Sequence, residues 1–167
     1  MACTLYSRCG KIQSKIVQSD EMPSDGGGQK HKEEVFFSSK EDIRMKLHFY
    51  GADRCVTGSC HCLEINGKKI LVDCGLQQGR DELDNRYLAF APGNIDILLV
   101  THAHIDHTGR IPLLVKNGFH GRILTTRLTA DLMKIMLLDS AHIQESDAEY
   151  ENRKGERAGR EHVDPLY

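Results

Sequence analysis

The sequence predicts an α/β protein in which a mixed β-sheet packs against flanking helices. Three segments with strand patterns come first, at 46–50, 59–65 and 69–75. A strand–helix–strand–helix order follows from residue 95 onward, and this alternation is typical of layered α/β folds. With 167 residues, 40% of them hydrophobic and 28% charged, the chain is long enough to bury the core of one ordinary domain.

Residues 1–44 differ in composition from the rest of the chain. They are largely polar, carry three consecutive glycines and show no sustained hydrophobic period. Such a composition buries too little apolar area to offset the entropy of ordering the chain. We therefore expect a disordered N-terminal extension over 1–44, and a folded unit over 45–167.

The early strand segments are joined by a recognisable turn. Residues 46–50 and 59–65 alternate in hydrophobicity, and 69–75 is mostly an apolar run. The dipeptide Asn66-Gly67 separates the second and third segments and is the strongest short-range signal for a hairpin. We therefore expect these two segments to pair as a tight hairpin.

Cys60 and Cys62 belong to one of these strand segments. The run Cys-His-Cys could supply half of a zinc site, yet no second pair with matching spacing follows. Residues two apart in a strand point to the same face. We therefore favour two strand cysteines on one face. With no secretory signal before them, their thiols are expected to be reduced in a cytoplasmic protein.

The second half of the chain contains two strand–helix pairs. Residues 95–101 are apolar enough for a strand buried on both faces, and a short helix is expected at 106–118. A further strand is expected at 121–126, followed by a long helix over 127–154 with Thr129 as its N-cap. The face of this helix that we expect to be buried carries Leu128, Leu132, Ile135 and Met136.

Four side chains able to bind a metal ion lie within six positions, directly after the apolar segment 95–101. His102 and His104 are two apart, so an extended backbone projects both to one side. The turn that follows can bring Asp106 and His107 toward the same space. Imidazole and carboxylate are ligands that suit zinc and similar ions, and burying four such groups unpaired would be costly. The cluster therefore predicts a metal site at the end of a strand.

The same residues lie within stretches that resemble a known family. "THAHIDHTGRIPLL" at 101–114 resembles the H-x-H-x-D-H signature of the metallo-β-lactamase superfamily. "VTGSCHCLEINGKKILVDCGLQQG" at 56–79 and "DSAHIQESDAEYENRK" at 139–154 resemble its RNA-processing branch, the β-CASP nucleases. The resemblance covers residues 45–167 and implies the layered αβ fold of the superfamily, of which only the N-terminal half is expected here.

The resemblance also implies roles for individual residues. His102 and His104 are expected to bind one zinc ion, and Asp106 and His107 a second. Two ions about 3.5–4 Å apart would activate a water for attack on a phosphodiester. The expected catalytic residues are Asp106, which would handle the proton, and Asp73, which would orient the site from behind the ligands.

The implied function is RNA cleavage by a zinc-dependent hydrolase, in endonucleolytic or exonucleolytic mode. Two alternatives stay open: a related hydrolase that acts on a thioester, lactam or lactone, and a metal-binding fragment without turnover. The second rests on the ligand count, because the chain offers four clear ligands and lacks the superfamily's later histidine and aspartate motifs. His142 is expected either near the substrate cleft or on an exposed helix surface.

Charge and hydropathy add little about partners. The net charge of −2 gives no global signal for nucleic acid, although a metal site can hold phosphate groups without a basic overall balance. RNA is expected as substrate from the resemblance, as is a homodimer formed through the complete fold. No run approaches the roughly 20 apolar residues of a membrane span, so no membrane partner is expected. His120 and His162 are expected to be solvated.

Overall fold

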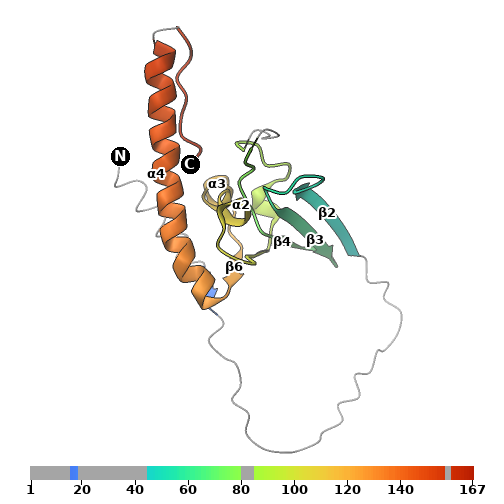
Figure 1. Ribbon diagram of the computed structural model, residues 1–167. Coiled ribbons are helices and arrows are strands. Elements are labelled where there is room, and N and C mark those ends of the chain that lie inside the picture. The colour runs from blue at the N-terminus through green and yellow to red at the C-terminus, as the bar shows by residue number, and fades with distance from the viewer. Residues whose placement is uncertain (1–15, 19–44, 80–84, 157–158) are drawn as a thin grey trace, which may run out of the picture.

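Six strands of the described chain form one mixed sheet (Figure 1). The computed structural model describes residues 16–18, 45–79, 85–156 and 159–167. The strands are β1 (Ile16–Gln18), β2 (Met45–Gly51), β3 (Cys60–Ile65), β4 (Lys68–Val72), β5 (Ile97–Leu99) and β6 (Arg122–Thr125). Their order is β1-β6-β5-β4-β3-β2, with β2, β3 and β4 antiparallel and the others parallel. The predicted α/β class and mixed sheet are confirmed.

The β3–β4 hairpin forms where the sequence predicts it. Ile65 pairs with Lys68 across a two-residue loop. Asn66 and Gly67 have φ angles of 48° and 80°. Positive φ at both loop positions defines the type I′ turn, whose twist matches that of the flanking strands, and Asn-Gly tolerates it best.

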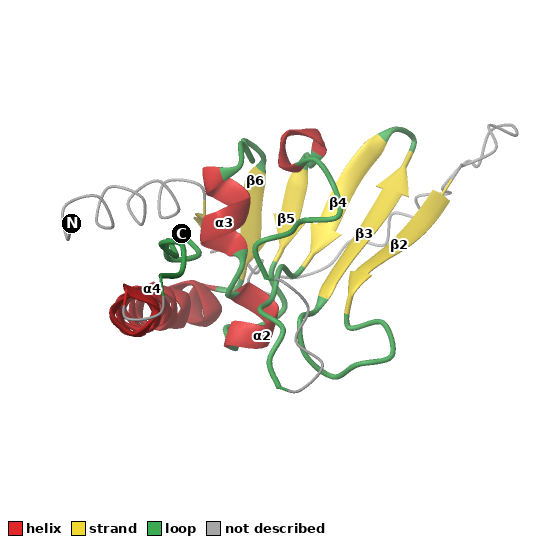
Figure 2. Ribbon diagram, turned by 90° about the horizontal axis from the view of Figure 1, so that it is seen from above, coloured by secondary structure: helices red, strands yellow, loops and turns green. Residues whose placement is uncertain are grey.

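Helices cover one face of the sheet in the part of the chain that the structure describes (Figure 2). Helices α2 (Ile105–Thr108) and α3 (Ile111–Lys116) lie over this face. Leu71, Leu98 and Ile123 are fully buried in the core beneath them. Leu99 points to the opposite face and is 37% exposed. The prediction that 95–101 is buried on both faces is therefore wrong, because the described residues leave its second face open.

Strand β5 is also shorter than predicted. The N–H of Val100 still donates to the carbonyl oxygen of Leu124, at 2.9 Å. The N–H of Thr101, however, donates to a carboxylate oxygen of Asp73 at 2.8 Å. The strand ends here because the next amide bonds a side chain in place of a neighbouring strand.

Strand β1 falls inside the segment that the sequence analysis assigns to a disordered extension. Ile16–Gln18 pair in parallel with β6, and Ile16 lies opposite Ile123. Three residues are too few for a hydrophobic period to be recognised, so the strand leaves no sequence signal. The remainder of the predicted extension, 1–15 and 19–44, lies outside the described residues.

The helix predicted over 106–118 is two short helices, α2 and α3. Pro112 lies in the first turn of α3, where a missing N–H costs nothing, whereas in the interior of one long helix it would break a hydrogen bond. Gly118 ends the second helix as predicted, with a φ of 98° that a glycine adopts without strain. Asp106 and His107 therefore lie on the helical turn α2.

The long helix α4 runs from Arg127 to Glu156. Its N-cap is Thr126, whose Oγ1 accepts a hydrogen bond from the N–H of Thr129 at 3.3 Å. The predicted N-cap, Thr129, is therefore wrong. A cap accepts from the amide three residues ahead, and Thr129 lies at that donor position.

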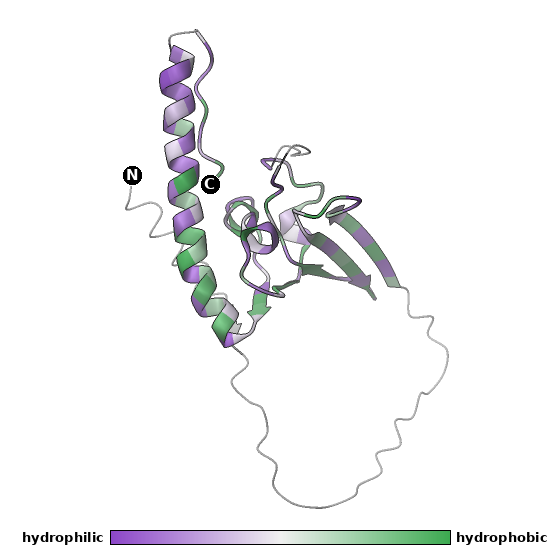
Figure 3. Cartoon of the chain, viewed as in Figure 1, coloured by the Kyte–Doolittle hydropathy of each residue, from purple (hydrophilic) through white to green (hydrophobic). Residues whose placement is uncertain are grey.

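The buried face of α4 also differs from the predicted one. Leu128, Leu132 and Ile135 are exposed, at 83%, 48% and 66%. The buried residues are mostly small: Ala130, Met133, Leu137, Ser140, Ala141, Ala148 and Gly155. Figure 3 shows hydrophobic residues concentrated in the first half of α4 and hydrophilic ones in the second. Two apolar stripes therefore compete in the first half, and the smaller side chains are the ones that pack inward.

The segment after α4 returns alongside it (Figure 1). Asn152 holds Val163 through two hydrogen bonds, of 2.9 and 2.7 Å. Tyr167 Oη lies 2.7 Å from Ser140 Oγ, and Leu166 and Tyr167 are buried. These last residues form a second apolar cluster with Leu76, Leu113 and Ala141. Among the described residues, no helix has the length and apolar character needed to cross a bilayer.

Candidate metal centre

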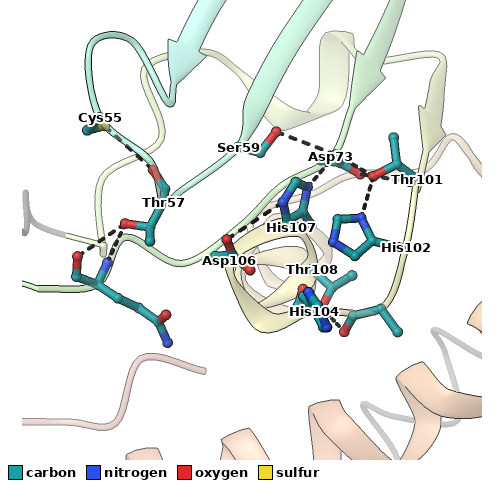
Figure 4. A network of polar contacts seen from close by, with 12 residues as sticks. Cys55, Thr57, Ser59, Asp73, Thr101, His102, His104, Asp106, His107 and Thr108 are labelled. Carbon is teal, nitrogen blue, oxygen red and sulfur yellow. Dashed lines mark hydrogen bonds and ion pairs between the residues drawn. The ribbon is translucent and has the colours of Figure 1, made fainter.

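The four predicted metal ligands gather beside Asp73 where β4 and β5 end (Figure 4). Asp73 directly follows β4, and Thr101 to His107 follow β5. Because the two strands are parallel neighbours, their carboxyl ends meet at one edge of the sheet, where layered α/β folds place their sites. The first turn of α2 then carries Asp106 and His107 back toward this edge.

Asp73 is the centre of the hydrogen-bond network. Its side chain accepts bonds from the N–H of Thr101 at 2.8 Å, from Thr101 Oγ1 at 2.8 Å and from Ser59 Oγ at 3.4 Å. His107 Nδ1 lies 2.8 Å from the same carboxylate. Asp73 is 2% exposed and has a φ of 60°, a left-handed conformation that aspartate tolerates better than most residues. A buried acid with four donors serves to orient its neighbours.

The backbone beneath the ligands is held by main-chain bonds. Cys74 N–H donates to the carbonyl of His107 at 2.8 Å, and Ser59 N–H to the carbonyl of Asp106 at 2.9 Å. Gly75 packs so closely that an added Cβ would stand 1.6 Å from the carbonyl oxygen of Asp106. The absence of a side chain at Gly75 therefore allows this close approach of the two backbone segments.

Arg110 is a buried residue whose guanidinium group bonds to two nearby backbone carbonyls. The residue is 5% exposed, and its Nε donates to the carbonyl of Gly75 at 2.6 Å. Its Nη1 donates to the carbonyl of Tyr87 at 3.3 Å. A buried guanidinium needs such acceptors, and here they bind the loop after β4 to the turn between α2 and α3.

The imidazole ring of His102 lies against those of His104 and His107. The ring centroids of His102 and His107 are 4.0 Å apart, and those of His102 and His104 are 4.7 Å apart. Asp106 Oδ2 lies 3.6 Å from His107 Nε2, which is too long for a hydrogen bond. Contacts between neighbours therefore link the four side chains in the order His104, His102, His107 and Asp106.

The four candidate ligands are of the chemical types that bind zinc, although their donor atoms do not converge on one point. Three imidazoles and one carboxylate are typical zinc ligands. Asp73 anchors His107 through Nδ1 and leaves Nε2 toward the ligand cluster. Within the described ranges, no group of three or more donors converges as a finished metal site.

The other predicted site residues lie apart from this cluster. His142 is exposed on α4, and no hydrogen bond or ring contact among the described residues joins it to Asp73. His120 and His162 are exposed, as predicted. Cys60 and Cys62 are both buried on the core side of β3, as expected for strand cysteines sharing one face.

Three residues of the network were not predicted: Ser59, Thr101 and Arg110. The first two contact Asp73 through hydroxyl groups, and the third holds the loop beside it. Serine and threonine are common and carry no distinctive spacing, so only the folded chain brings residues 59, 73 and 101 together. The position of Thr101, between an apolar strand and the first histidine, was the one available signal.

Comparison with known proteins gives relatives named as a ribonuclease, a transcription termination factor and a cleavage and polyadenylation factor. A ribonuclease of Thermus thermophilus is 42% identical over 102 residues, which are 60% of this chain and 24% of the relative. Transcription termination factor FttA of Methanosarcina mazei is 33% identical over 132 residues, 77% of this chain and 20% of the relative. Cleavage and polyadenylation specificity factor 73 of Drosophila melanogaster is 37% identical over 113 residues, 66% of this chain and 16% of the relative.

The chain spans about a quarter or less of the length of these relatives. Their names agree with the RNA-processing branch expected from the sequence. The family model described as the metallo-beta-lactamase superfamily, whose members generally bind metal ions, matches residues 53–161. That match includes Asp73 and all four candidate ligands, and the chain belongs to the metallo-beta-lactamase superfamily.

Proposed function

We propose that the protein is a zinc-dependent hydrolase that cleaves RNA phosphodiester bonds. The observation that carries the proposal is the cluster of three imidazoles and one carboxylate organised around Asp73. Few structural roles require so many titratable groups on one short turn, whereas metal-dependent hydrolysis uses these groups directly. Superfamily membership supports the same chemistry.

His102, His104, Asp106 and His107 would hold the metal, with two zinc ions expected in the complete enzyme. When bound, such ions lower the pKa of water and polarise a phosphoryl oxygen. Asp73 lies behind His107 and keeps that ring fixed in orientation. Asp106 is at the edge of the cluster, half-buried and without a short hydrogen bond to His107, so its carboxylate is available to accept a proton.

RNA is the proposed substrate because the matched relatives carry the names of a ribonuclease and of RNA-processing factors. A binding role for His142 remains a prediction, since this exposed residue of α4 lies outside the Asp73 network. The proposal also includes the expected homodimer and a cytoplasmic location. The free thiols of Cys55, Cys60, Cys62 and Cys74 agree with that location.

The test is hydrolysis by the zinc-loaded chain. An end-labelled RNA oligonucleotide and a chromogenic lactam are offered separately to the wild type and to the variants His102→Ala and His120→Ala. His120 is an exposed histidine outside the cluster, so its variant is the matched control. We expect RNA cleavage by the wild type and the control, and at least a hundredfold loss in His102→Ala.

Each result that contradicts the proposal would support a different interpretation. Hydrolysis of the lactam with RNA left intact would replace the proposal with another superfamily hydrolase. Stoichiometric zinc binding without cleavage of either compound would assign the chain to the metal-binding, non-catalytic alternative. Equal RNA cleavage in His102→Ala and wild type would mean that the histidine cluster is not the site of cleavage.

A further inference from the structure

The hydroxyl of Thr101 touches two members of the candidate site at once. Its Oγ1 lies 2.8 Å from Asp73 Oδ2 and 3.1 Å from Asp73 Oδ1. On its other side the same oxygen lies 3.0 Å from His102 Nδ1. Thr101 thus stands between the buried acid and the first histidine of the cluster (Figure 4).

The proton positions follow from the chemistry of these three groups. A carboxylate only accepts hydrogen bonds, so the single proton of the threonine hydroxyl must point to Asp73. Otherwise two bare oxygens would face each other at 2.8 Å. The hydroxyl can then only accept from His102, which places a proton on Nδ1. In a neutral imidazole the lone pair is then on Nε2.

His107 obeys the same logic without an intermediary. Its Nδ1 lies 2.8 Å from Asp73 Oδ2, so Nδ1 carries a proton, and in the neutral ring Nε2 is again the nitrogen with the lone pair. The buried carboxylate of Asp73 therefore sets the tautomer of two histidines, that of His107 by direct contact and that of His102 through the Thr101 hydroxyl. The main-chain N–H of Thr101, which donates to Asp73 Oδ1 at 2.8 Å, fixes the hydroxyl between its two partners.

We propose that Thr101 is a positioning residue that fixes the Nδ1–H tautomer of His102, so that Nε2 of this ring is the atom presented to a metal. The inference deepens the proposed function and rests on it for the identity of the ligand. Thr101 itself does not bind the metal. It acts through Asp73 and His102, as groups behind metal ligands do.

The first measurement uses the metal-free protein and needs no activity. Two-bond proton–nitrogen correlations of the imidazoles, recorded where the rings are neutral, report which nitrogen of His102 is protonated. We expect Nδ1–H in the wild type and in Thr101→Ser, which keeps the hydroxyl. We expect a shift toward Nε2–H, the form that a neutral histidine side chain favours in water, in Thr101→Val.

The second measurement is zinc affinity by competition with a chromophoric chelator. Thr101→Val should bind zinc about tenfold to a hundredfold more weakly, the range typical of lost groups behind metal ligands. Thr101→Ser should restore affinity to within about threefold. The control is Thr125→Val, which removes a hydroxyl bond to the carbonyl of Val100 on a neighbouring strand. This control should retain wild-type affinity.

The outcomes separate this inference from the proposed function. An unchanged His102 tautomer in Thr101→Val would overturn the inference, and so would an Nε2–H tautomer in Thr101→Ser, a variant expected to fold. Equal loss of affinity in Thr101→Val and Thr125→Val would also overturn it, because the effect would then be general. If the wild type shows the Nδ1–H tautomer but binds no zinc, the proposed function fails while the positioning role of Thr101 stands.

Discussion

Gly75 shows how little space the backbone leaves beneath the candidate metal ligands. Its Cα faces the carbonyl of Asp106 and the N–H of His107, both on the turn that carries two of the ligands. A side chain at this position would push that turn away from Asp73. The spacing of the ligands therefore depends on a residue that binds nothing.

Gly75→Ala is expected to lower the free energy of unfolding by about 3 kcal/mol, the upper part of the range for overpacked sites. The reason is the 1.6 Å separation between the added Cβ and the carbonyl oxygen of Asp106. Urea denaturation followed by circular dichroism measures the change in the free energy of unfolding. Gly93→Ala is the control, because its Cβ would meet only one atom, at 3.7 Å, and should change stability by less than about 0.5 kcal/mol. Equal losses in both variants would contradict the close packing at Gly75.

Among individual residues, the candidate ligands are easier to recognise in the sequence than the residues that contact Asp73. His102, His104, Asp106 and His107 are recognisable because four chemically distinctive residues fall within six positions. The supporting hydroxyls of Ser59 and Thr101 meet Asp73 only after two strands have paired. A contact between residues distant in sequence leaves no local pattern to detect.

Among the elements, helix α4 departs most from its sequence prediction. The large apolar residues that follow the helical period, such as Leu128 and Ile135, face solvent. The alanines and Met133 face the protein. Hydrophobicity favours the larger side chains, whereas close approach of a helix to its neighbours favours small ones. Periodicity correctly predicted the helix, but it could not choose between two apolar stripes.

Met133→Ala is expected to destabilise the protein by about 2–5 kcal/mol, because Met133 is fully buried in the main core. Leu128→Ala, on the stripe that the sequence favoured, should change stability by less than about 0.5 kcal/mol because Leu128 is 83% exposed. Thermal or urea unfolding of the two variants gives the comparison. A larger loss of stability in Leu128→Ala than in Met133→Ala would instead support the buried face predicted from the sequence.

Proline explains the other departure among the elements. The apolar pattern of 106–118 is continuous, yet Pro112 divides it into two helices. Arg110 lies between these helices and donates a hydrogen bond to the carbonyl of Gly75. A proline inside a helical pattern is itself a sequence signal for a boundary. The division into α2 and α3 could therefore have been predicted, whereas the partner of Arg110 could not.

The part of the molecule that the structure describes is asymmetric about its sheet. The described helices cover one face, and the other face is apolar across several strands. Leu47 and Phe49 of β2 are 55% and 60% exposed on that side, and Leu47 lies directly opposite Leu63 of β3. An exposed apolar edge strand is prone to association between chains.

Leu47→Lys is expected to raise the concentration at which the protein stays monodisperse and to leave stability nearly unchanged, because the side chain is already half in water. Light scattering over a concentration series and urea unfolding measure the two effects. Leu71→Lys, which places the same charge at a fully buried position of β4, should unfold the protein. Unfolding by Leu47→Lys would show that the open face is packed in solution.

The pairing of Ile16 with Ile123 has a consequence for the order in which the molecule assembles. Residues 19–121 separate these two strands, so during synthesis β1 leaves the ribosome long before its partner β6 exists. The central strands and the turn bearing the histidines can form first, through contacts closer in sequence, and the docking of β1 must come late. Pulse-labelled amides of Ile16–Gln18 should therefore gain protection after those of β3 and β4.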